Sequence, residues 1–264
     1  MENISALMDL KGKTAIVTGG ALGIGLGIVY RLAEAGANVV IANNVEAAAL
    51  DAVRDLTAKK WNVSEILTDV SKEEDVKKMV EFAVSTYGAV DILVNNAGIY
   101  PSVTFANMTL ADFEKVINVN LKGVFLCVKY VSEQMIKQGK GGKIINVTSV
   151  DALHPSSIGL AHYDASKHGV WGFTKNVALE LAQHKIWVNA IAPGAILTPG
   201  TQVPQKENTG VDMKKILEVF MTKIPMHRMG EPDEIGKVAL FLASEMSSYM
   251  TGSQIVVDGG VLLS

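Results

Sequence analysis

Short apolar runs alternate along the chain with longer segments in which apolar residues recur every three or four positions. The runs are typical of buried strands, and the longer segments are typical of helices that cover a sheet. The runs predict seven strands, at Lys13–Thr18, Asn38–Ala42, Val63–Asp69, Asp91–Asn95, Lys143–Val147, Trp187–Ile191 and Gln254–Val257. The helical segments lie at Leu26–Ala35, Glu46–Lys59, 71–87, Ala111–Gln138, Tyr163–Gln183 and Glu231–Ala243. This alternation predicts an α/β fold, a single doubly wound Rossmann-type domain over residues 1–264 with a mostly parallel seven-stranded sheet and helices on both faces.

Two local patterns add detail to this outline. Ser71-Lys-Glu-Glu74 has the sequence of a capping box and predicts the start of the helix that runs towards Tyr87. Residues 199–210 interrupt the alternation, and apolar residues at helical spacing follow them, namely Met213, Ile216, Leu217, Phe220, Met221 and Ile224. An amphipathic helix on such a tether predicts a substrate lid at about 198–226, and the alternative is an ordinary surface helix.

Composition narrows the class of protein. Apolar residues make up 48% of the chain and charged residues 19%, which is typical of a compact globular protein. The net charge of −3 provides no basic field, so we expect no nucleic-acid partner. Neither a signal peptide nor an apolar run long enough to span a membrane is apparent, and Cys127 is the only cysteine. We therefore expect a cytoplasmic protein with no membrane association.

A glycine-rich segment, Thr18-Gly-Gly-Ala-Leu-Gly-Ile-Gly25, lies between the first predicted strand and the first helix. Glycines there let the backbone turn tightly and approach a pyrophosphate, whose charge is stabilised by the N-terminus of the helix. The spacing differs from the common Gly-x-Gly-x-x-Gly, but its position between strand and helix predicts a nucleotide site. Ligands of such sheets bind at the carboxyl ends of the strands, where small or polar residues are found at Asn43, Asp69, Asn95–Gly98, Ser149 and Pro193-Gly194.

Tyr163 and Lys167 are candidates for proton chemistry. They are four residues apart, so on a helix they lie on one face. A neighbouring ammonium favours the phenolate, and we expect Lys167 to lower the pKa of Tyr163. Ser149 follows a predicted buried strand, where its hydroxyl can reach a substrate oxygen held beside Tyr163. By itself, the Tyr-x-x-x-Lys spacing is more often a pair on a helix surface.

Further segments complete a recognisable order: Asn95–Gly98, Asn120-Leu-Lys-Gly123, Pro193-Gly194 with Thr198, Ile224–Pro232 and Val257–Gly260. With the glycine-rich segment and Ser149, Tyr163 and Lys167, the chain resembles the short-chain dehydrogenase/reductase family over nearly its whole length. The resemblance implies a nicotinamide cofactor and hydride transfer to or from a substrate carbon. It implies catalytic roles for Asn120, Ser149, Tyr163 and Lys167. It also implies cofactor contacts at Gly19, Leu22, Gly23, Ile24, Gly25, Asn43, Asp69, Val70, Asn96, Ala97, Gly98, Tyr163, Lys167, Pro193, Gly194, Ile196 and Thr198.

The roles implied by the resemblance are specific. Tyr163 exchanges a proton with the substrate oxygen, and Ser149 hydrogen-bonds the same oxygen. Lys167 also holds the nicotinamide ribose, and Asn120 positions a water that links Lys167 to solvent. This chemistry needs no metal, and the histidines show no ligand spacing.

The substrate is less well defined. The predicted pocket is largely apolar, with Tyr100, Asp151, His154 and Leu197 as candidate substrate contacts. No arginine cluster is available to bind a phosphate or carboxylate, so we expect an uncharged secondary alcohol or ketone. One alternative is a 3-oxoacyl-carrier-protein reductase, which would call for a basic docking patch. Another is an NAD-binding module without turnover, but the intact catalytic set argues against it.

Cofactor preference and assembly complete the predictions. Asn43 stands where NAD-using relatives place aspartate, Asn44 where many NADP-using ones place arginine, and Leu22 at a second common basic position. Without a cation for the extra phosphate, we expect NAD to be preferred, with leakage to NADP. Small residues along Tyr163–Gln183, together with the helix Ala111–Gln138, offer packing surfaces to a neighbouring subunit. Because relatives commonly pair through these helices, we expect a homotetramer.

Overall fold

A computed structural model describes residues 3–201 and 221–264 of the chain. The strands are β1 (Thr14–Thr18), β2 (Asn38–Asn43), β3 (Val63–Leu67), β4 (Ile92–Asn95), β5 (Gly142–Val147), β6 (Ile186–Pro193) and β7 (Gln254–Val257). They form one seven-stranded sheet in the order β3-β2-β1-β4-β5-β6-β7, and every pairing is parallel. The predicted doubly wound α/β fold is therefore confirmed, with a sheet that is wholly parallel.

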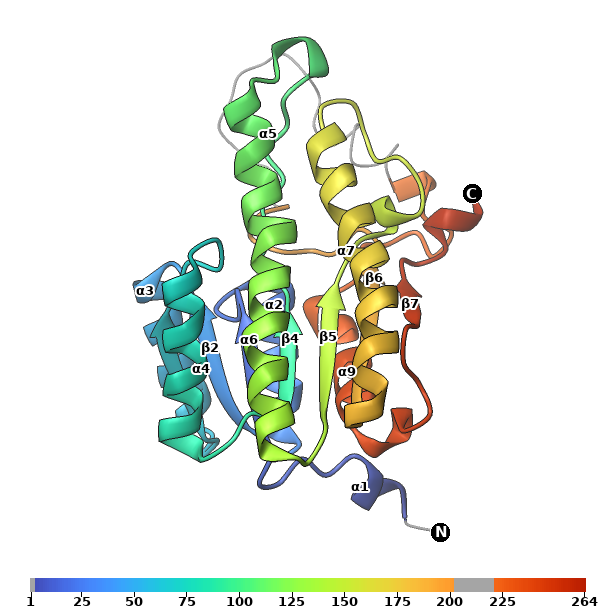
Figure 1. Cartoon of the computed structure of the whole chain (residues 1–264). Coiled ribbons are helices and arrows are strands. Elements are labelled where there is room, and N and C mark those ends of the chain that lie inside the picture. Colours follow the sequence, from blue (N-terminus) through green and yellow to red (C-terminus); the bar gives the residue numbers. More distant parts are fainter. Residues whose placement is uncertain (1–2, 202–220) are drawn as a thin grey trace.

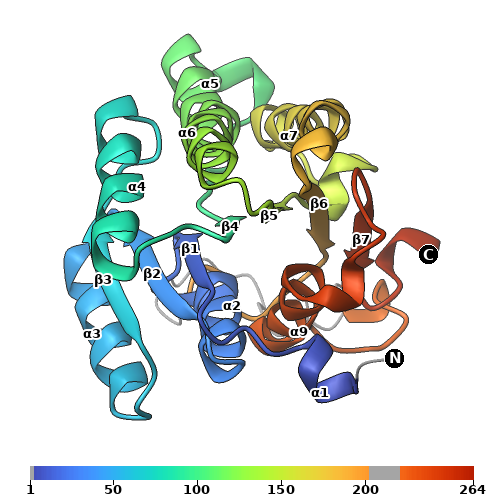
Figure 2. The same ribbon diagram turned by 60° about the horizontal axis from the view of Figure 1, so that its bottom comes forward.

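Helices cover both faces of the sheet (Figures 1 and 2). They are α1 (Ile4–Leu7), α2 (Gly23–Glu34), α3 (Glu46–Thr57), α4 (Glu73–Tyr87), α5 (Leu110–Ile117), α6 (Gly123–Gln138), α7 (Ala161–Leu181) and α9 (Pro232–Ala243). One apolar core lies between the sheet and α2, α3 and α9, and a second lies between the sheet and α4, α6 and α7. Because both faces are covered, β1 and β4 are buried along their whole length, which explains why their central residues are apolar.

Two local predictions need correction. The capping box at residues 71–74 is wrong, because α4 begins after Lys72 without a side-chain cap. The Ser71 hydroxyl instead donates to the Asp69 carboxylate at 2.7 Å. The long helix predicted from Ala111 is divided, since a π-helical turn at Asn118–Lys122 separates α5 from α6. The predicted lid at about 198–226 falls mainly on residues 202–220, outside the described residues.

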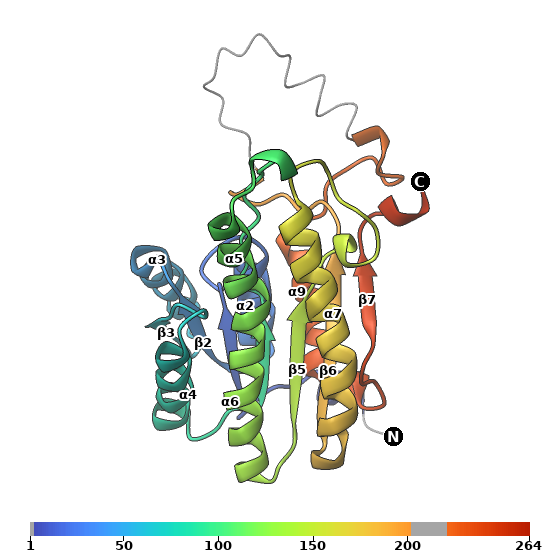
Figure 3. The same ribbon diagram turned by 45° about the horizontal axis from the view of Figure 1, so that its top comes forward.

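The carboxyl ends of the strands meet at the edge that Figure 3 turns towards the viewer. Strand β1 pairs with β2 on one side and with β4 on the other, so the strand order reverses between β1 and β4. In an open parallel sheet a crevice for ligands forms at such a reversal. In the described part of the chain, no helix has the length and apolar content needed to cross a bilayer.

Candidate active site

The glycine-rich turn after β1 is fastened to the end of β4. The Asn96 amide nitrogen donates to the carbonyl oxygens of Thr18 and Gly19, each at 3.0 Å. The Thr18 hydroxyl oxygen accepts from the backbone N–H groups of Asn96 and Ala97 at 3.0 and 3.1 Å. Gly19 has a φ of +63°, and a Cβ there would lie 3.0 Å from the Cα of Ala97. The turn thus needs glycine and is held in one position relative to β4.

The N-terminus of α2 fits an anionic group. Its N-cap, Leu22, provides no side-chain hydrogen bond, and the first turn of α2 carries no acidic residue. The first backbone N–H groups of a helix have no partner within the helix, and the helix dipole favours negative charge there. Gly25 lets the turn close tightly, since a Cβ on it would lie 2.1 Å from the carbonyl oxygen of Gly19. These residues suit the pyrophosphate of a dinucleotide, as predicted for Gly19, Leu22, Gly23, Ile24 and Gly25.

The ends of β2 and β3 provide the next predicted contacts. The Asn43 amide nitrogen donates to the Val45 carbonyl at 3.0 Å, which leaves the amide oxygen able to accept a hydrogen bond. Asn44 is exposed, and so is the side chain of Leu22. The Asp69 carboxylate accepts from the backbone N–H and the hydroxyl of Ser71. Val70 is buried against Gly123, where a Cβ would lie 2.8 Å from a Val70 methyl group.

The segment after β6 reaches over the glycine-rich turn. Gly194 passes so close to the end of β7 that a Cβ on it would lie 2.7 Å from the Cα of Asp258. Ile196 is buried and pairs with Gly230 in an isolated bridge. Thr198 then lies beside the glycine-rich turn, since its methyl group would be 3.1 Å from a Cβ on Gly23. The structure therefore brings Pro193–Thr198 to the crevice between β1 and β4.

Helix α7 carries Tyr163 and Lys167 on one face, as their spacing predicted. The buried Lys167 Nζ donates to the carbonyl oxygen of Val147, the last residue of β5, at 2.8 Å. The same Nζ lies 5.6 Å from the centroid of the Tyr163 ring and would lie 3.7 Å from a Cβ on Gly98. Lys167 is thus held between the end of β5, the phenol and the loop after β4.

Burial changes the ionisation of both groups. It raises the pKa of the Tyr163 phenol above its ordinary value, and the charge of Asp151 acts in the same direction. Burial also lowers the pKa of Lys167 to about 8. The predicted lowering of the Tyr163 pKa by Lys167 is wrong for these surroundings, because removing a phenolate from water costs more than the neighbouring ammonium offsets.

Ser149 follows β5 and lies at the start of a short 3-10 turn, Val150–Ala152. Its hydroxyl oxygen accepts from the Asp151 backbone N–H at 3.1 Å, and the hydroxyl donates to the Asp151 carboxylate at 2.9 Å. Both residues lie close to the phenol, since Asp151 and Ser149 are each among the groups that shift the pKa of Tyr163. The structure therefore brings Ser149, Tyr163 and Lys167 together.

Asn120 lies in the π-helical turn and is almost completely buried. Its amide oxygen accepts from the Ile99 backbone N–H at 2.8 Å, and its amide nitrogen donates to the Ile99 carbonyl and the Ser166 hydroxyl. Asn120 thus fastens the loop after β4 to α7, one residue before Lys167. Turns of π-helix are frequent at functional sites.

The candidate substrate residues differ in their surroundings. Tyr100 is 47% exposed, and its ring meets the Tyr163 ring edge-on with centroids 6.0 Å apart. Leu197 is also about half exposed, Asp151 is half-buried, and His154 is exposed with its Nδ1 at 2.9 Å from the Pro155 carbonyl. An open pocket beside the catalytic group is lined by Gly98, Ile99, Tyr100, Pro101, Lys115 and Gly200. Asp151 is therefore the only one of these four candidates that is not exposed.

Sequence reasoning missed two supporting residues. Thr18 fastens the glycine-rich turn to β4, and Ser166 bonds both the Asn120 amide and the Tyr163 carbonyl. The signal for Thr18 was its position as the last residue of a buried strand, where a hydroxyl needs a partner. Ser166 gave a weaker signal, because a serine beside Lys167 is equally compatible with an exposed position on the helix.

Comparison with known proteins identifies the family. Residues 19–262 match the family model described as enoyl-(acyl carrier protein) reductase. The chain is 42% identical over 258 residues to the Thermotoga maritima 3-oxoacyl-[acyl-carrier-protein] reductase FabG, covering 97% of this chain and 100% of that protein. The chain belongs to the short-chain dehydrogenase/reductase family. This is the family that the motifs indicated.

Two further relatives illustrate the range of the family. The chain is 36% identical to the Staphylococcus epidermidis diacetyl reductase [(S)-acetoin forming], over 95% of this chain and 98% of that protein. A solved Agrobacterium tumefaciens structure, described as a candidate 2-deoxy-D-gluconate 3-dehydrogenase with bound NADP, superposes with a TM-score of 0.86 at 35% identity. It covers 98% of this chain and 99% of that one. The chain is therefore an oxidoreductase of a family that acts on ketones and alcohols with a nicotinamide cofactor.

Proposed function

We propose that this protein is an NAD-preferring alcohol dehydrogenase/ketone reductase that acts on uncharged secondary alcohols and ketones. The observation that carries the proposal is the placement of Ser149, Tyr163 and Lys167 at the end of β5, beside a pyrophosphate-type turn at the end of β1. The nicotinamide cofactor, when bound, supplies or accepts the hydride. The side chains need only handle a proton and the charge on one substrate oxygen.

The proton step follows from the surroundings of Tyr163. Burial raises the pKa of the phenol, so Tyr163 is held in its protonated form. In reduction, the carbonyl carbon gains a hydride and the carbonyl oxygen gains the phenol proton. In oxidation, a phenolate must first form and then take the hydroxyl proton, so oxidation is expected to accelerate as pH rises. Lys167 favours the phenolate by its charge, and Ser149 hydrogen-bonds the reacting oxygen.

The proposed preference for NAD rests on the end of β2. The free amide oxygen of Asn43 can accept a hydrogen bond from a ribose hydroxyl. A 2′-phosphate would call for a cation there, whereas positions 22, 43 and 44 are Leu22, Asn43 and Asn44. One relative of known structure binds NADP. Because asparagine does not repel a phosphate, we expect NADP to be used slowly rather than excluded.

A second candidate function is reduction of 3-oxoacyl groups on an acyl carrier protein, which the name of the Thermotoga maritima relative favours. An acidic carrier would call for several cations around the mouth of the pocket. Of the described residues that line the pocket, Lys115 alone is charged. We therefore rank this function second.

A cofactor-absorbance assay distinguishes these functions. The protein would be tested with NADH and NADPH on small ketones, with the matching secondary alcohols in reverse, and on a 3-oxoacyl thioester with and without its carrier protein. We expect turnover of ketones and alcohols, with a higher kcat/KM for NAD(H). Reduction of the carrier-bound thioester alone would support the second function. Cofactor binding without turnover would support a non-catalytic NAD-binding module, which is the remaining alternative.

We also propose a homotetramer. Apolar side chains remain exposed on α5, α6 and α7, among them Phe113, Phe125 and Leu179. On α7, Gly169 packs against Leu121 of the same chain, whereas a Cβ on Gly172 would have open space around it. Part of the small-residue surface of α7 is therefore available to a second copy. Sedimentation at micromolar concentration tests this, and a stable monomer would contradict it.

A further inference from the structure

Asp151 is a carboxylate in the catalytic centre for which the proton chemistry has no use. It lies in the 3-10 turn that packs against α7, two residues after Ser149. Its Oδ2 accepts the Ser149 hydroxyl at 2.9 Å. Its charge acts on Tyr163, while Lys167, His154 and Asp164 act on it in turn, so these are the ionisable groups that face it.

The Asp151 carboxylate has too few partners for its position. A carboxylate offers about four positions for hydrogen-bond donors. Within residues 3–201 and 221–264, the Ser149 hydroxyl is the one donor to Asp151, and no lysine or arginine forms an ion pair with it. Asp164, on α7, contrasts with it, because its two oxygens accept from the Ser156 backbone N–H and hydroxyl. A half-buried charge with a single donor is costly, and burial raises the pKa of Asp151.

The same contact limits the hydrogen bonds that Ser149 can donate. A serine hydroxyl has one proton, and here it is donated to Asp151. Ser149 can then accept a hydrogen bond but cannot donate one to the reacting oxygen. A ligand donor that replaced Ser149 at Asp151 would release this proton and allow Ser149 to stabilise negative charge on that oxygen. The structure thus calls for a donor on the substrate, next to the reacting oxygen.

We propose that Asp151 accepts a hydrogen bond from a hydroxyl on the carbon next to the reacting carbon, so that the preferred substrates are vicinal diols and α-hydroxy ketones. This proposal rests on the proposed function. The Asp151 carboxylate lies one hydrogen-bond length from the Ser149 hydroxyl, and the two oxygens of a vicinal diol are separated by a similar distance. One oxygen can therefore face Ser149 and Tyr163 while the other faces Asp151.

Other substrate chemistries fit this pair less well. A 3-oxoacyl thioester has only acceptor oxygens near its reacting carbon, so it would leave Asp151 unpaired. A carboxylate in this position would be repelled by Asp151. An ammonium group would be attracted, but Lys167 already places one positive charge close to Asp151. A neutral hydroxyl satisfies the carboxylate without adding a charge to the site.

The test uses two substrates of the same shape, propane-1,2-diol and butan-2-ol, in which a hydroxyl replaces a methyl group. With NAD, the native enzyme is expected to favour the diol in kcat/KM by roughly 10- to 100-fold, the usual range for a hydrogen bond to a charged group. Asp151→Ala should remove this preference, lowering kcat/KM for the diol while that for butan-2-ol stays the same or rises. Asp151→Asn keeps the shape without the charge and should give an intermediate ratio. Asp55→Asn, at an exposed position of α3, is the matched control.

Each other outcome overturns the proposal in a distinct way. An equal loss on both substrates in Asp151→Ala and Asp151→Asn would mean that Asp151 only holds Ser149 in place. An unchanged preference in both variants would mean that Asp151 does not contact the substrate. A stronger preference for 1-aminopropan-2-ol would identify an ammonium group in place of the hydroxyl. Failure of the native enzyme on all three alcohols, with reduction of a carrier-bound thioester, would overturn the proposed function together with this inference.

Discussion

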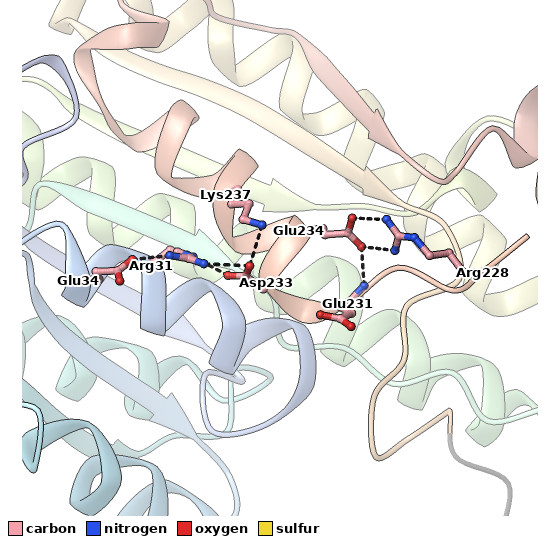
Figure 4. Close-up of polar contacts among 7 residues, drawn as sticks. All are labelled: Arg31, Glu34, Arg228, Glu231, Asp233, Glu234 and Lys237. Carbon is pink, nitrogen blue, oxygen red and sulfur yellow. Dashed lines mark hydrogen bonds and ion pairs between the residues drawn. The ribbon is translucent and has the colours of Figure 1, made fainter. Parts of the chain in front are cut away.

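Two regions of this protein differ in how completely their charged side chains are paired. Between α2 and α9, Arg31 donates to the Asp233 carboxylate, which also pairs with Lys237 at 2.9 Å (Figure 4). Nearby, Arg228 forms a bidentate ion pair with Glu234. The hydrogen bonds from Arg31 lower the pKa of Asp233 to about 2, and those from Arg228 lower the pKa of Glu234 to about 2. Here each charge has partners, and its charged form is favoured.

The candidate catalytic centre has the reverse arrangement. Lys167 is buried, and Asp151 is half-buried with a hydroxyl as its partner. Burial lowers the pKa of Lys167 and raises those of Asp151 and Tyr163, so each group is shifted towards its neutral form. Pairing as complete as that between α2 and α9 would leave no capacity for a substrate. We infer that the buried charges of the candidate catalytic centre lower stability, whereas the Arg31–Asp233 pair between α2 and α9 raises it.

The largest effect is expected when the phenol is removed. Tyr163→Phe should lower kcat by roughly 10²- to 10⁴-fold, because no other group takes over the proton transfer. The melting temperature should change little, since the ring keeps its volume. Tyr249→Phe, at a fully exposed position, is the control and should keep full activity. Substantial turnover by Tyr163→Phe would remove Tyr163 from the mechanism.

The second-largest effect is expected when the buried ammonium of Lys167 is removed, which tests whether it lowers stability. The pKa of Lys167 is about 8 in the fold against an ordinary value of 10.5, so the unfolded chain binds more protons between these pH values. Stability should therefore rise as pH increases from 8 to 10.5. Lys167→Met should raise the free energy of unfolding at pH 7 by on the order of 1–3 kcal/mol while abolishing activity, and the gain should vanish above pH 10.5. Urea unfolding at pH 7 and 10.5 measures it, with Lys175→Met of the same helix as control.

How much of this contrast could be predicted depends on the range of the interactions. The fold was predictable because apolar runs such as Ile92–Val94 in β4 specify strands that are buried on both faces. The grouping of Ser149, Tyr163 and Lys167 was predictable because they occur in a recognisable order. The π-helical turn at Asn118–Lys122 was not, since it is a local change of backbone hydrogen bonding inside a longer helical segment.

Local competition for hydrogen bonds also limited what could be predicted from the sequence. The sequence at residues 71–74 satisfies a capping box, but the Ser71 hydroxyl donates to Asp69 and the helix begins after Lys72. The direction of the Tyr163 pKa was missed because spacing reveals the neighbouring lysine but not the burial of both groups. Asp151 was identified as a candidate contact, whereas its bond to Ser149 depends on the turn that follows β5.

A smaller effect is expected when a charge is added to the cofactor crevice. Asn43→Asp should raise the ratio of kcat/KM for NAD to that for NADP by about tenfold, because a carboxylate binds a ribose hydroxyl and repels a phosphate. Both cofactors would be measured on one substrate. Asn62→Asp, just before β3 and bonded to Asn38, is a distant control for the added charge. An unchanged ratio, or a native enzyme that prefers NADP, would show that another residue determines the preference.

The smallest effect is expected when an interhelical pair is broken. Arg31→Met removes both hydrogen bonds to Asp233, whose side chain is 36% exposed, so solvent screening limits the loss to about 1 kcal/mol. Because the pKa of Asp233 is about 2 in the fold and 3.8 ordinarily, the contribution is complete above pH 4 and is lost as pH falls towards 2. Urea unfolding of the two proteins should therefore differ at pH 7 and converge in acid, while kcat is unchanged.

Arg54→Met, which breaks an exposed pair on α3, should have almost no effect at any pH. If Arg31→Met were as stable as the native protein at pH 7, the pairs between α2 and α9 would not offset the cost of the buried catalytic charges, and the contrast between the two regions would concern ionisation alone.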